Sequence, residues 1–399
     1  MDDVSRSPRG NVKCCDKPCC KKRTAVDKVA QISNLPYRRF LIGRVADACW
    51  RFERTRPLQN AILRYSRLEI CATLSLALAR NASGKCRPVY YGAVKHFTKP
   101  LGALCVCALL LIAQKTIATD RAEALRGCFG TYAGAPKLPS GHVDQQKLMA
   151  ELLDIHANTY HWLFRSKPVE FEDFKAFLPL AREKNIKVWV TLVPPSETLP
   201  KGATPTEAMK KEYEDWVLEF ARLSASAPHF VAWSIDDFPY NLKFWTPQDM
   251  AKLTEAVHQL NPRLAFVPCC YYRQMTTAFV KNYAPYCDGI LFPYRDDSVP
   301  PGNLQNAGHV KSEVKALRQR FGKAMPIILD VYATAHSRLG ASTPAYVEQV
   351  MVQGKAVADG VLVYCHQHEQ DNPAKYGIIK RLFAQWSRGS QMLRSPKES

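Results

Sequence analysis

Residues 231–240, VAWSIDDFPY, join an apolar run to two adjacent acids, Asp236 and Asp237. Side chains along a strand point alternately to its two faces, so small residues and Asp236 share one face and bulky residues share the other. The small residues are Ala232 and Ser234, and the bulky ones are Val231, Trp233 and Ile235. A small face suits the narrow interior of a β-barrel, and a bulky face suits packing under helices. The stretch therefore predicts a barrel strand that aims Asp236 at the axis and leaves Asp237 in the loop.

The same alternation of apolar runs and helical patterns fills residues 126–388. Eight apolar runs are predicted as strands, at 126–134, 159–164, 186–193, 230–236, 264–272, 288–294, 325–332 and 359–365. Helical patterns follow them at 143–158, 171–185, 206–224, 247–260, 276–283, 307–321, 344–358 and 373–386. Eight strand and helix pairs predict an α/β fold of the (β/α)8 TIM-barrel class. A doubly wound sheet also alternates, but the Gly-rich phosphate loop that often accompanies that fold is missing.

Active sites of such barrels lie at the carboxyl ends of the strands, where the following loops converge. Carboxylates at these ends are the candidates for catalysis: Asp236, Asp237 and Asp330. Aromatic, imidazole and charged residues at the same ends are the candidates for substrate binding: Tyr132, His161, Trp162, Tyr240, Tyr272, Tyr294, Arg295, Tyr332, His366, His368 and Glu369. Glu197 also follows a strand, the third, without an assigned role. Asp296 and Asp297 have the pattern of a solvated loop.

Two carboxyl groups across a pocket, one protonated and one ionised, are what glycoside hydrolysis requires. Asp330 shares a strand face with Ile328 and Tyr332, so it is expected to aim at the same space as Asp236. Sugar rings stack on aromatic side chains, and the candidates for such a platform are Trp162, Trp189, Tyr240, Trp245, Tyr272 and Tyr294. The sequence thus favours a glycosidase.

The motifs IDDF at 235–238 and ILDVY at 328–332 make residues 126–388 resemble the TIM-barrel glycoside hydrolases and hydrolase-like proteins of bacterial secretomes. The resemblance implies that an acid at the end of strand four is the proton donor and that a second carboxylate lies at the end of strand seven. It also implies hydrolysis of a polysaccharide or glycoconjugate without a cofactor. The chain departs from the commonest pattern, which has Glu at both positions, and it lacks the DxxDxDxE run of chitinase-like barrels.

Two other functions stay open. A metal-dependent hydrolase or deacetylase would use Asp236, His366 and His368 as ligands, because alternate residues of an extended stretch face the same side. A barrel that binds glycans without cleaving them would result if Asp236 and Asp330 lay too far apart or were engaged in ion pairs, for example Asp236 with Arg295.

The positive charge of the chain lies mostly at its front. The formal net charge is +19, and residues 1–100 carry +14 of it, with 21 Lys and Arg against 7 Asp and Glu. The remaining residues carry only +5, so no nucleic-acid partner is expected for the barrel. Nine of the 14 cysteines also precede residue 120. The five later ones cannot all pair internally and are predicted to be small buried hydrophobic residues.

Residues 94–119 have the three regions of a secretory signal: a basic start, an apolar run at 101–113, and small residues before a cleavage point after Ala118. They are predicted to be a signal peptide or an uncleaved membrane anchor. Either predicts an exported protein (periplasmic, cell-surface or extracellular) whose only membrane contact is this segment. Residues 1–93, basic and rich in Cys, are then an over-extended gene prediction or a cytoplasmic region. Residues 389–399 are predicted to be a disordered tail, and the oligomeric state is left open.

Overall fold

A computed structural model of the chain describes residues 119–200, 202–366 and 368–392. The predicted N-terminal segment at 1–93 and all but the last residue of the predicted signal or anchor segment lie outside these ranges. Within them, no helix has both the length and the apolar character needed to cross a membrane.

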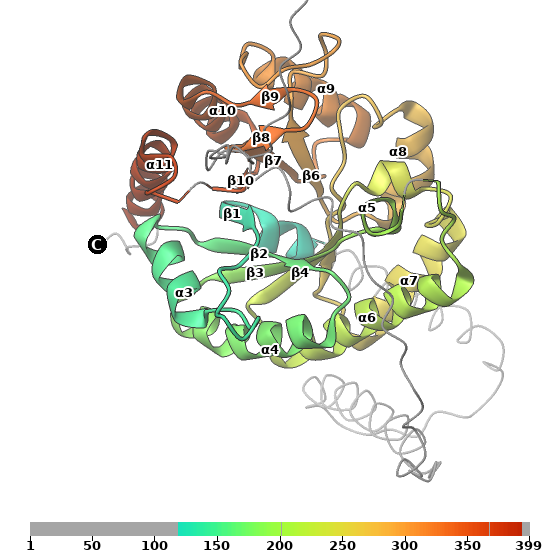
Figure 1. The fold of residues 1–399 in the computed structure, drawn as a ribbon. Helices are drawn as coiled ribbons and strands as arrows, with labels where there is room; N and C mark the ends of the chain where they lie inside the picture. Colours follow the sequence, from blue (N-terminus) through green and yellow to red (C-terminus); the bar gives the residue numbers. More distant parts are fainter. Residues whose placement is uncertain (1–118, 201, 367, 393–399) are drawn as a thin grey trace, which may run out of the picture. The chain divides into compact units, whose positions relative to one another are not determined.

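Eight parallel strands form one sheet, in the order β5-β4-β3-β2-β1-β10-β7-β6. They are β1 (Phe129–Ala133), β2 (Thr159–Phe164), β3 (Lys187–Leu192), β4 (Phe230–Ile235), β5 (Ala265–Phe266), β6 (Ile290–Tyr294), β7 (Ile327–Tyr332) and β10 (Gly360–Tyr364). Each lies within a run predicted from the sequence. The first and last of them are neighbours, since β1 pairs with β10 in parallel (Figure 1).

The two edges of this sheet are joined by backbone hydrogen bonds beyond β5. Strand β5 has only two residues, because Pro268 has no N–H to donate to the ladder. The chain after it still bonds on both sides. Cys269 N donates to Ile235 O at 3.1 Å, Cys270 N donates to Leu291 O at 2.8 Å, and Leu291 N donates to Pro268 O at 3.0 Å. The result is a TIM-like α/β fold.

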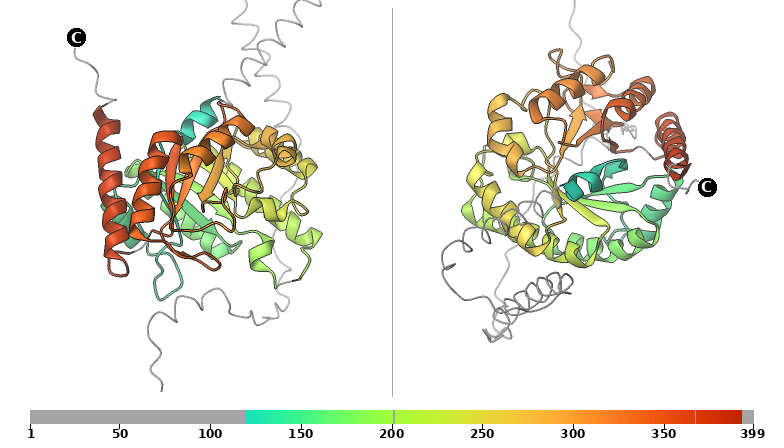
Figure 2. Two further views of the ribbon diagram at one scale, coloured as in Figure 1. Left: turned by 90° about the horizontal axis from the view of Figure 1, so that it is seen from above. Right: turned by 180° about the vertical axis from the view of Figure 1, so that it is seen from behind.

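Helices surround the sheet (Figure 1). The main ones are α3 (Gln145–Asp154), α4 (Pro168–Glu183), α6 (Glu207–Ser226), α7 (Pro247–Leu260), α8 (Thr277–Tyr283), α9 (Val310–Phe321), α10 (Pro344–Val357) and α11 (Pro373–Met392). Four of them start at a threonine whose side chain accepts a backbone N–H of the first turn: Thr206, Thr246, Thr276 and Thr343. Figure 2 shows α10 and α11 side by side. Helix α11 runs to Met392, so residues 389–392, predicted as part of a disordered tail, are helical.

The hydrophobic core has an inner part and an outer part. Ala232, Ile328 and Leu362 belong to the inner cluster, enclosed by the strands. Trp233 and Ile235 belong to the outer cluster, between sheet and helices. The predicted orientation of strand four is therefore confirmed for Ala232, Trp233 and Ile235, whereas Val231, predicted on the outer side, packs against the inner cluster. The five cysteines of the described ranges form no disulfide. Four of them are buried, as predicted for most of the five, and Cys365 is half-buried.

Gly130 marks a close approach between β1 and β2. A Cβ added there would overlap the backbone carbonyl of Thr159, whereas a Cβ on Gly134 would have open space. We expect Gly130→Ala to lower the free energy of unfolding by at least about 2 kcal/mol, because neither strand backbone can move away. Gly134→Ala should change it by less than about 1 kcal/mol. Chemical denaturation of both variants tests this, and equal stabilities would contradict the packing described.

Candidate active site at the carboxyl ends of the strands

Three carboxylates meet at the ends of β3 and β4. One oxygen each of Glu197, Asp236 and Asp237 lies within 4.8 Å of the others. Asp236 and Asp237 directly follow β4, as predicted. Glu197 arrives by a different route, because Pro194 and Pro195 lead from β3 into the single helical turn α5 (Pro195–Thr198). Its position after a strand could be seen in the sequence, but its approach to the other two acids depends on this turn.

Asp236 is held by two donors. The hydroxyl of Tyr132 donates to its Oδ2 at 2.7 Å, and the backbone N–H of Asp237 donates to its Oδ1 at 3.0 Å. Loss of solvent around the carboxylate, and then the negative charge of Asp237, raise the pKa of Asp236 to about 6, although these bonds oppose the shift. Asp236 therefore stands near the point of half-ionisation at mildly acidic pH.

Asp237 lies in the left-handed region, with φ 45°, at the start of the short helical segment η2 (Phe238–Asn241). Asp tolerates this conformation better than most residues. The hydroxyl of Tyr271 donates to its Oδ1. Burial raises the pKa of Asp237, but this bond and the positive charge of Arg295 oppose the rise. Among the three acids, Asp237 is the one whose ionised form is favoured by two arginine charges, those of Arg295 and Arg338.

Asn241 connects the turns that carry Glu197 and Asp237. Its Nδ2 donates to the Asp237 carbonyl at 2.9 Å and to Ser196 Oγ at 2.9 Å, and its Oδ1 accepts from Ser196 N at 3.3 Å.

Desolvation, followed by the charges of Asp236 and Asp237, raises the pKa of Glu197 to about 8. The negative charges of Asp236 and Asp237 disfavour ionisation of Glu197, so Glu197 is the acid of this cluster that favours its protonated form most.

The floor beneath the cluster is uncharged. Asp330 of β7 is 1% exposed, and burial followed by the negative charge of Asp236 raises its pKa well above the ordinary range. Its Oδ1 has no hydrogen-bond partner among the described residues. The ring of His161 stacks on Tyr132, with centroids 4.3 Å apart, and burial lowers the pKa of His161 to about 3. A neutral acid and a neutral imidazole thus lie below the three rim carboxylates.

Tyrosines form one wall of the site. The ring of Tyr364 lies 5.3 Å from that of Tyr132 and 5.2 Å from that of Tyr332, measured between centroids. Tyr132 and Tyr332 were predicted as site residues, whereas Tyr364 and Tyr271 were not. Both stand at the end of a predicted strand, which was the available signal.

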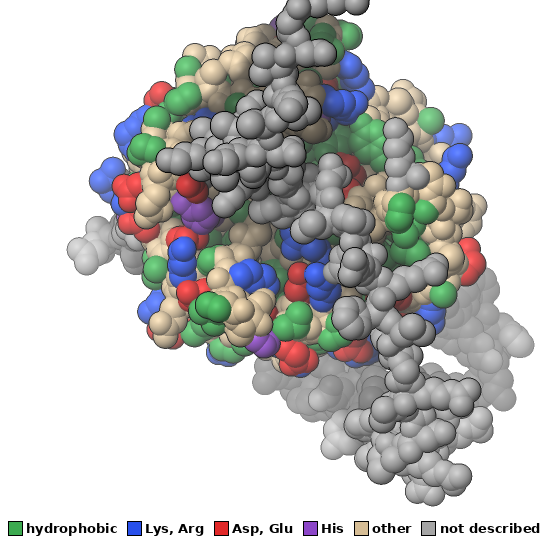
Figure 3. All heavy atoms as spheres, in the orientation of Figure 1, with side chains coloured by type: hydrophobic (Ala, Val, Ile, Leu, Met, Phe, Trp, Pro, Cys, Tyr) green, Lys and Arg blue, Asp and Glu red, His purple; other side chains and the backbone are tan. Residues whose placement is uncertain are grey.

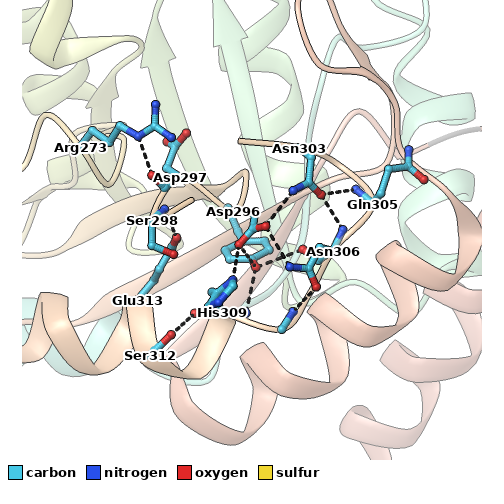
Figure 4. A network of polar contacts seen from close by, with 12 residues as sticks. Arg273, Asp296, Asp297, Ser298, Asn303, Gln305, Asn306, His309, Ser312 and Glu313 are labelled. Atoms are coloured by element: carbon cyan, nitrogen blue, oxygen red, sulfur yellow. Dashed lines mark hydrogen bonds and ion pairs between the residues drawn. The ribbon is translucent and has the colours of Figure 1, made fainter. Parts of the chain in front are cut away.

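The loop after β6 positions Arg295. Asp296, 1% exposed, accepts hydrogen bonds from Asn303 at 2.7 Å, Asn306 at 2.9 Å and the His309 ring at 2.6 Å (Figure 4). The polar pair of Asp296 and Asp297 is therefore buried, not a solvated loop as predicted, because the loop folds its own donors around Asp296.

Within this loop, Arg295 pairs with Asp297 at 2.9 Å. The predicted alternative, an ion pair with Asp236, is not formed. The guanidinium lies over the ring of Tyr271, 3.9 Å from its centroid. Asp297 thus holds Arg295 against the tyrosine that donates to Asp237.

A cavity of about 410 Å³ opens beside Arg295. Its lining includes Arg273, Arg295 and Arg338, together with Asp297 and Tyr240. Tyr240, a predicted binding residue, is 49% exposed, and its ring centroid lies 5.8 Å from that of Tyr271. The cavity is therefore next to the carboxylates and has a basic wall.

Several predicted platform residues lie elsewhere. Trp162, Trp245 and Tyr294 are buried in the outer core; Trp162, for example, packs against Phe174 and Phe177 of α4. These three side chains face the surrounding helices and not the rim, so the prediction that they form a sugar platform is wrong. Trp189 is buried in the inner core. Tyr272 is half-buried beneath the guanidinium of Arg320, which is 4.6 Å from its ring centroid.

The predicted metal set is split between two clusters. His366 and His368 approach Glu151 of α3, while Asp236 lies with Glu197 and Asp237. Glu369 is exposed next to the histidines. On the face shown in Figure 3, basic and acidic side chains of the described residues are interspersed.

No protein-family model matches the chain, and no curated protein matches it. Similar solved structures are glycoside hydrolases. A β-glucuronidase of an uncultured Clostridium sp. is 13% identical, with 59% of this chain and 43% of that one covered and a TM-score of 0.44. A GH113 β-1,4-mannanase is 9% identical, with 66% and 98% covered and a TM-score of 0.49.

A β-D-glucuronidase of Dictyoglomus thermophilum is 16% identical, with 64% of this chain and 50% of that one covered and a TM-score of 0.45. The chain thus spans half or less of the two glucuronidases. Since every TM-score is below 0.5, these likenesses do not decide the activity of this chain.

The raised pKa of Asp236 predicts a pH-dependent stability. Its pKa of about 6 in the folded chain exceeds the ordinary value of 3.8, so the folded state binds the proton more tightly than the unfolded state. The free energy of unfolding should fall as pH rises from about 4 to about 6, and Asp236→Asn should remove this loss. We expect the melting temperature of Asp236→Asn, relative to the parent, to be higher at pH 8 than at pH 4. Asp215→Asn, at an exposed helix position, is the control; a difference independent of pH would contradict the assignment.

Proposed function

We propose that the chain is a glycoside hydrolase that cleaves the glycosidic bonds of a polysaccharide or glycoconjugate. The observation that carries this proposal is the cluster of Glu197, Asp236 and Asp237, in which the pKa of Glu197 is raised to about 8 while Tyr271 and Arg295 favour the ionised form of Asp237. Glycoside hydrolysis requires one carboxyl group that donates a proton and one that is ionised. Tyr240, which is exposed, and Tyr364, which is half-buried, supply flat apolar faces for a sugar ring.

Glu197 is the proton donor in this mechanism. Its raised pKa keeps it protonated at neutral pH, and it lies at the exposed rim, where a leaving oxygen has access. Asp237 is the ionised partner, stabilised by Tyr271 and Arg295. It attacks the anomeric carbon or activates water. Asp236 and Tyr132 hold Asp237 through its backbone N–H, and Asp330 lies below them as a neutral acid.

The spacing of the cluster favours retention of configuration. One oxygen from each of the three carboxyl groups lies within 4.8 Å of the other two. Inverting enzymes need carboxyl groups about 6.5–9.5 Å apart, to leave room for water, and retaining enzymes about 5–5.5 Å. The proton donor suggested by the resemblance, an acid on strand four, is replaced in this proposal by Glu197 after strand three.

The arginine-lined cavity supports an anionic substrate. Three guanidinium groups and a single carboxylate face the same space, and guanidinium groups bind carboxylates and sulfates through paired hydrogen bonds. The sugar chain then carries carboxylate or sulfate groups. Residues 94–119 support export of the enzyme, which would bring it to extracellular glycans.

A metal-dependent hydrolase is the second candidate. The same three carboxylates are close enough to share a divalent cation. Hard divalent cations prefer oxygen ligands such as carboxylates. In that case the cation, not Glu197, would polarise the bond to be cleaved. A glycan-binding barrel without turnover is the third possibility, and activity measurements separate all three.

Hydrolysis of polysaccharides and nitrophenyl glycosides by the purified protein, with and without chelator, tests the proposal. Asp237→Asn should lower kcat/KM by a factor of about 10²–10⁴ on both polysaccharides and nitrophenyl glycosides. Glu197→Gln should lower it mainly on polysaccharides, because nitrophenolate leaves without a proton donor. Activity of the parent should fall as pH rises through about 8, and Glu197→Gln should lack this limb. Glu212→Gln, on an exposed helix face, is the control.

Loss of activity on chelation would contradict the metal-independent mechanism and favour the metal-dependent hydrolase. Glycan binding without turnover on any substrate would exclude catalysis.

Arg338 tests the charge of the substrate. It is exposed at the cavity, so Arg338→Gln should leave the fold intact. We expect KM to rise about tenfold on uronate-containing or sulfated substrates, since one charged hydrogen bond contributes about 1.5–3 kcal/mol, with little change on neutral ones. Arg222→Gln, on α6, is the matched control. An equal effect on neutral and acidic substrates would overturn the anionic assignment.

A further inference from the structure

A second cluster of ionisable residues lies away from the three carboxylates. Glu151 projects from α3, and His366 and His368 follow β10. His366 Nε2 is 3.9 Å from Glu151 Oε2, and His368 Nδ1 is 3.3 Å from Glu151 Oε1. Each carboxylate oxygen thus faces a different imidazole nitrogen, and one such atom from each residue lies within 4.8 Å of the others.

The tautomer of His366 follows from its contact with Thr131. Thr131 Oγ1 lies 3.1 Å from Val363 O, a carbonyl that can only accept, and 2.8 Å from His366 Nδ1. The hydroxyl has one proton. Both contacts are hydrogen bonds only if Thr131 donates to Val363 and accepts from a protonated Nδ1. In the neutral form of the His366 ring, Nε2 then carries a lone pair, and it lies 3.9 Å from Glu151 Oε2.

Two lone pairs therefore face each other in a buried place. The side chain of His366 is 4% exposed, and that of Glu151 is 15% exposed. Neither His366 Nε2 nor Glu151 Oε2 has a hydrogen-bond partner among the described residues. Within those residues, the ion-pair contacts of Glu151 are the two histidines, without a Lys or Arg. A buried carboxylate oxygen beside an acceptor nitrogen is unfavourable unless a cation lies between them.

We propose that Glu151, His366 and His368 bind a divalent transition-metal ion such as Zn²⁺, through one carboxylate oxygen, Nε2 and Nδ1, respectively. Two imidazoles and a carboxylate are a common ligand set for zinc. Ligand atoms at about 2.0–2.1 Å from a tetrahedral zinc lie roughly 3.3 Å from one another, and one candidate ligand atom from each of the three residues already lies within 4.8 Å of the others. Thr131 orients His366, as outer hydrogen-bond partners of metal-binding histidines do.

A simple ion pair explains less of this arrangement. Protonated His368 paired with Glu151 accounts for Nδ1 and Oε1, but it leaves His366 Nε2 and Glu151 Oε2 without partners. The metal ion satisfies all three residues. His368 is 43% exposed, so solvent can reach the site and fill a fourth ligand position.

Bound metal would connect the beginning and the end of the barrel. Glu151 lies on the first helix after β1, and the histidines lie on the loop after β10, the neighbour of β1 in the sheet. Metal binding should therefore stabilise the folded chain, since it favours the state in which the ligands are together. This inference does not depend on the proposed glycosidase activity.

The test is zinc binding by the purified full chain after chelator treatment and dialysis. We expect Glu151→Gln and His366→Gln to bind one zinc ion fewer than the parent, by elemental analysis at equilibrium. His156→Asn is the control, because it removes an exposed histidine from the same region and Asn tolerates its positive φ of 57°. Comparing variants cancels any zinc bound by the cysteines before residue 120.

Zinc should raise the melting temperature of the parent and of His156→Asn more than that of either ligand variant. If a buried substitution prevents folding, as seen by circular dichroism, the exposed His368→Ala replaces it. Folded variants that bind as much zinc as the parent, and gain as much thermal stability from it, would overturn the proposal. The hydrolase assay then remains a separate question.

Discussion

Parallel hydrogen bonding around the sheet is the constraint on which the rest of the structure depends. Because every strand runs in the same direction, every carboxyl end reaches the same rim, and residues from distant parts of the sequence meet there. The weakest part of this arrangement is β5, where Pro268 interrupts the ladder. The bonds of Cys269 and Cys270 to β4 and β6 restore it. Without them, the loop that carries Tyr271 would lose its position beside Asp237.

The close carboxyl groups at this rim lower the stability of the folded chain. Asp236 and Asp237 raise the pKa of Glu197, Asp237 raises that of Asp236, and Asp330 lies buried below without a partner for one oxygen. Such an arrangement destabilises the folded chain relative to one with neutral residues. Its persistence in a barrel whose core is otherwise well packed is typical of a site retained for chemistry.

The carboxylates of Asp296 and Glu151 have different surroundings. Around Asp296, neighbouring amide and imidazole groups donate hydrogen bonds to the carboxylate (Figure 4). Around Glu151, Oε2 faces Nε2 of His366, and neither atom has a hydrogen-bond partner among the described residues. The first arrangement stabilises a structure, and the second is suited to a cation.

The sequence by itself determined the strand and helix order, the direction in which Ala232 and Trp233 face, and the presence of Asp236 and Asp237 at a strand end. These features depend on periodicity and chain direction, which are local. Tertiary structure decided the rest. Glu197 joins Asp236 only through the turn after Pro195, and Trp162 and Tyr294 pack under helices although they stand at strand ends. His366 lies next to Glu151 and not next to Asp236. The reason is that β1, which precedes the helix of Glu151, and β10, which precedes His366, become neighbours only once the sheet has formed. Partners separated by more than two hundred residues are set by packing, and no local pattern in the chain records that choice.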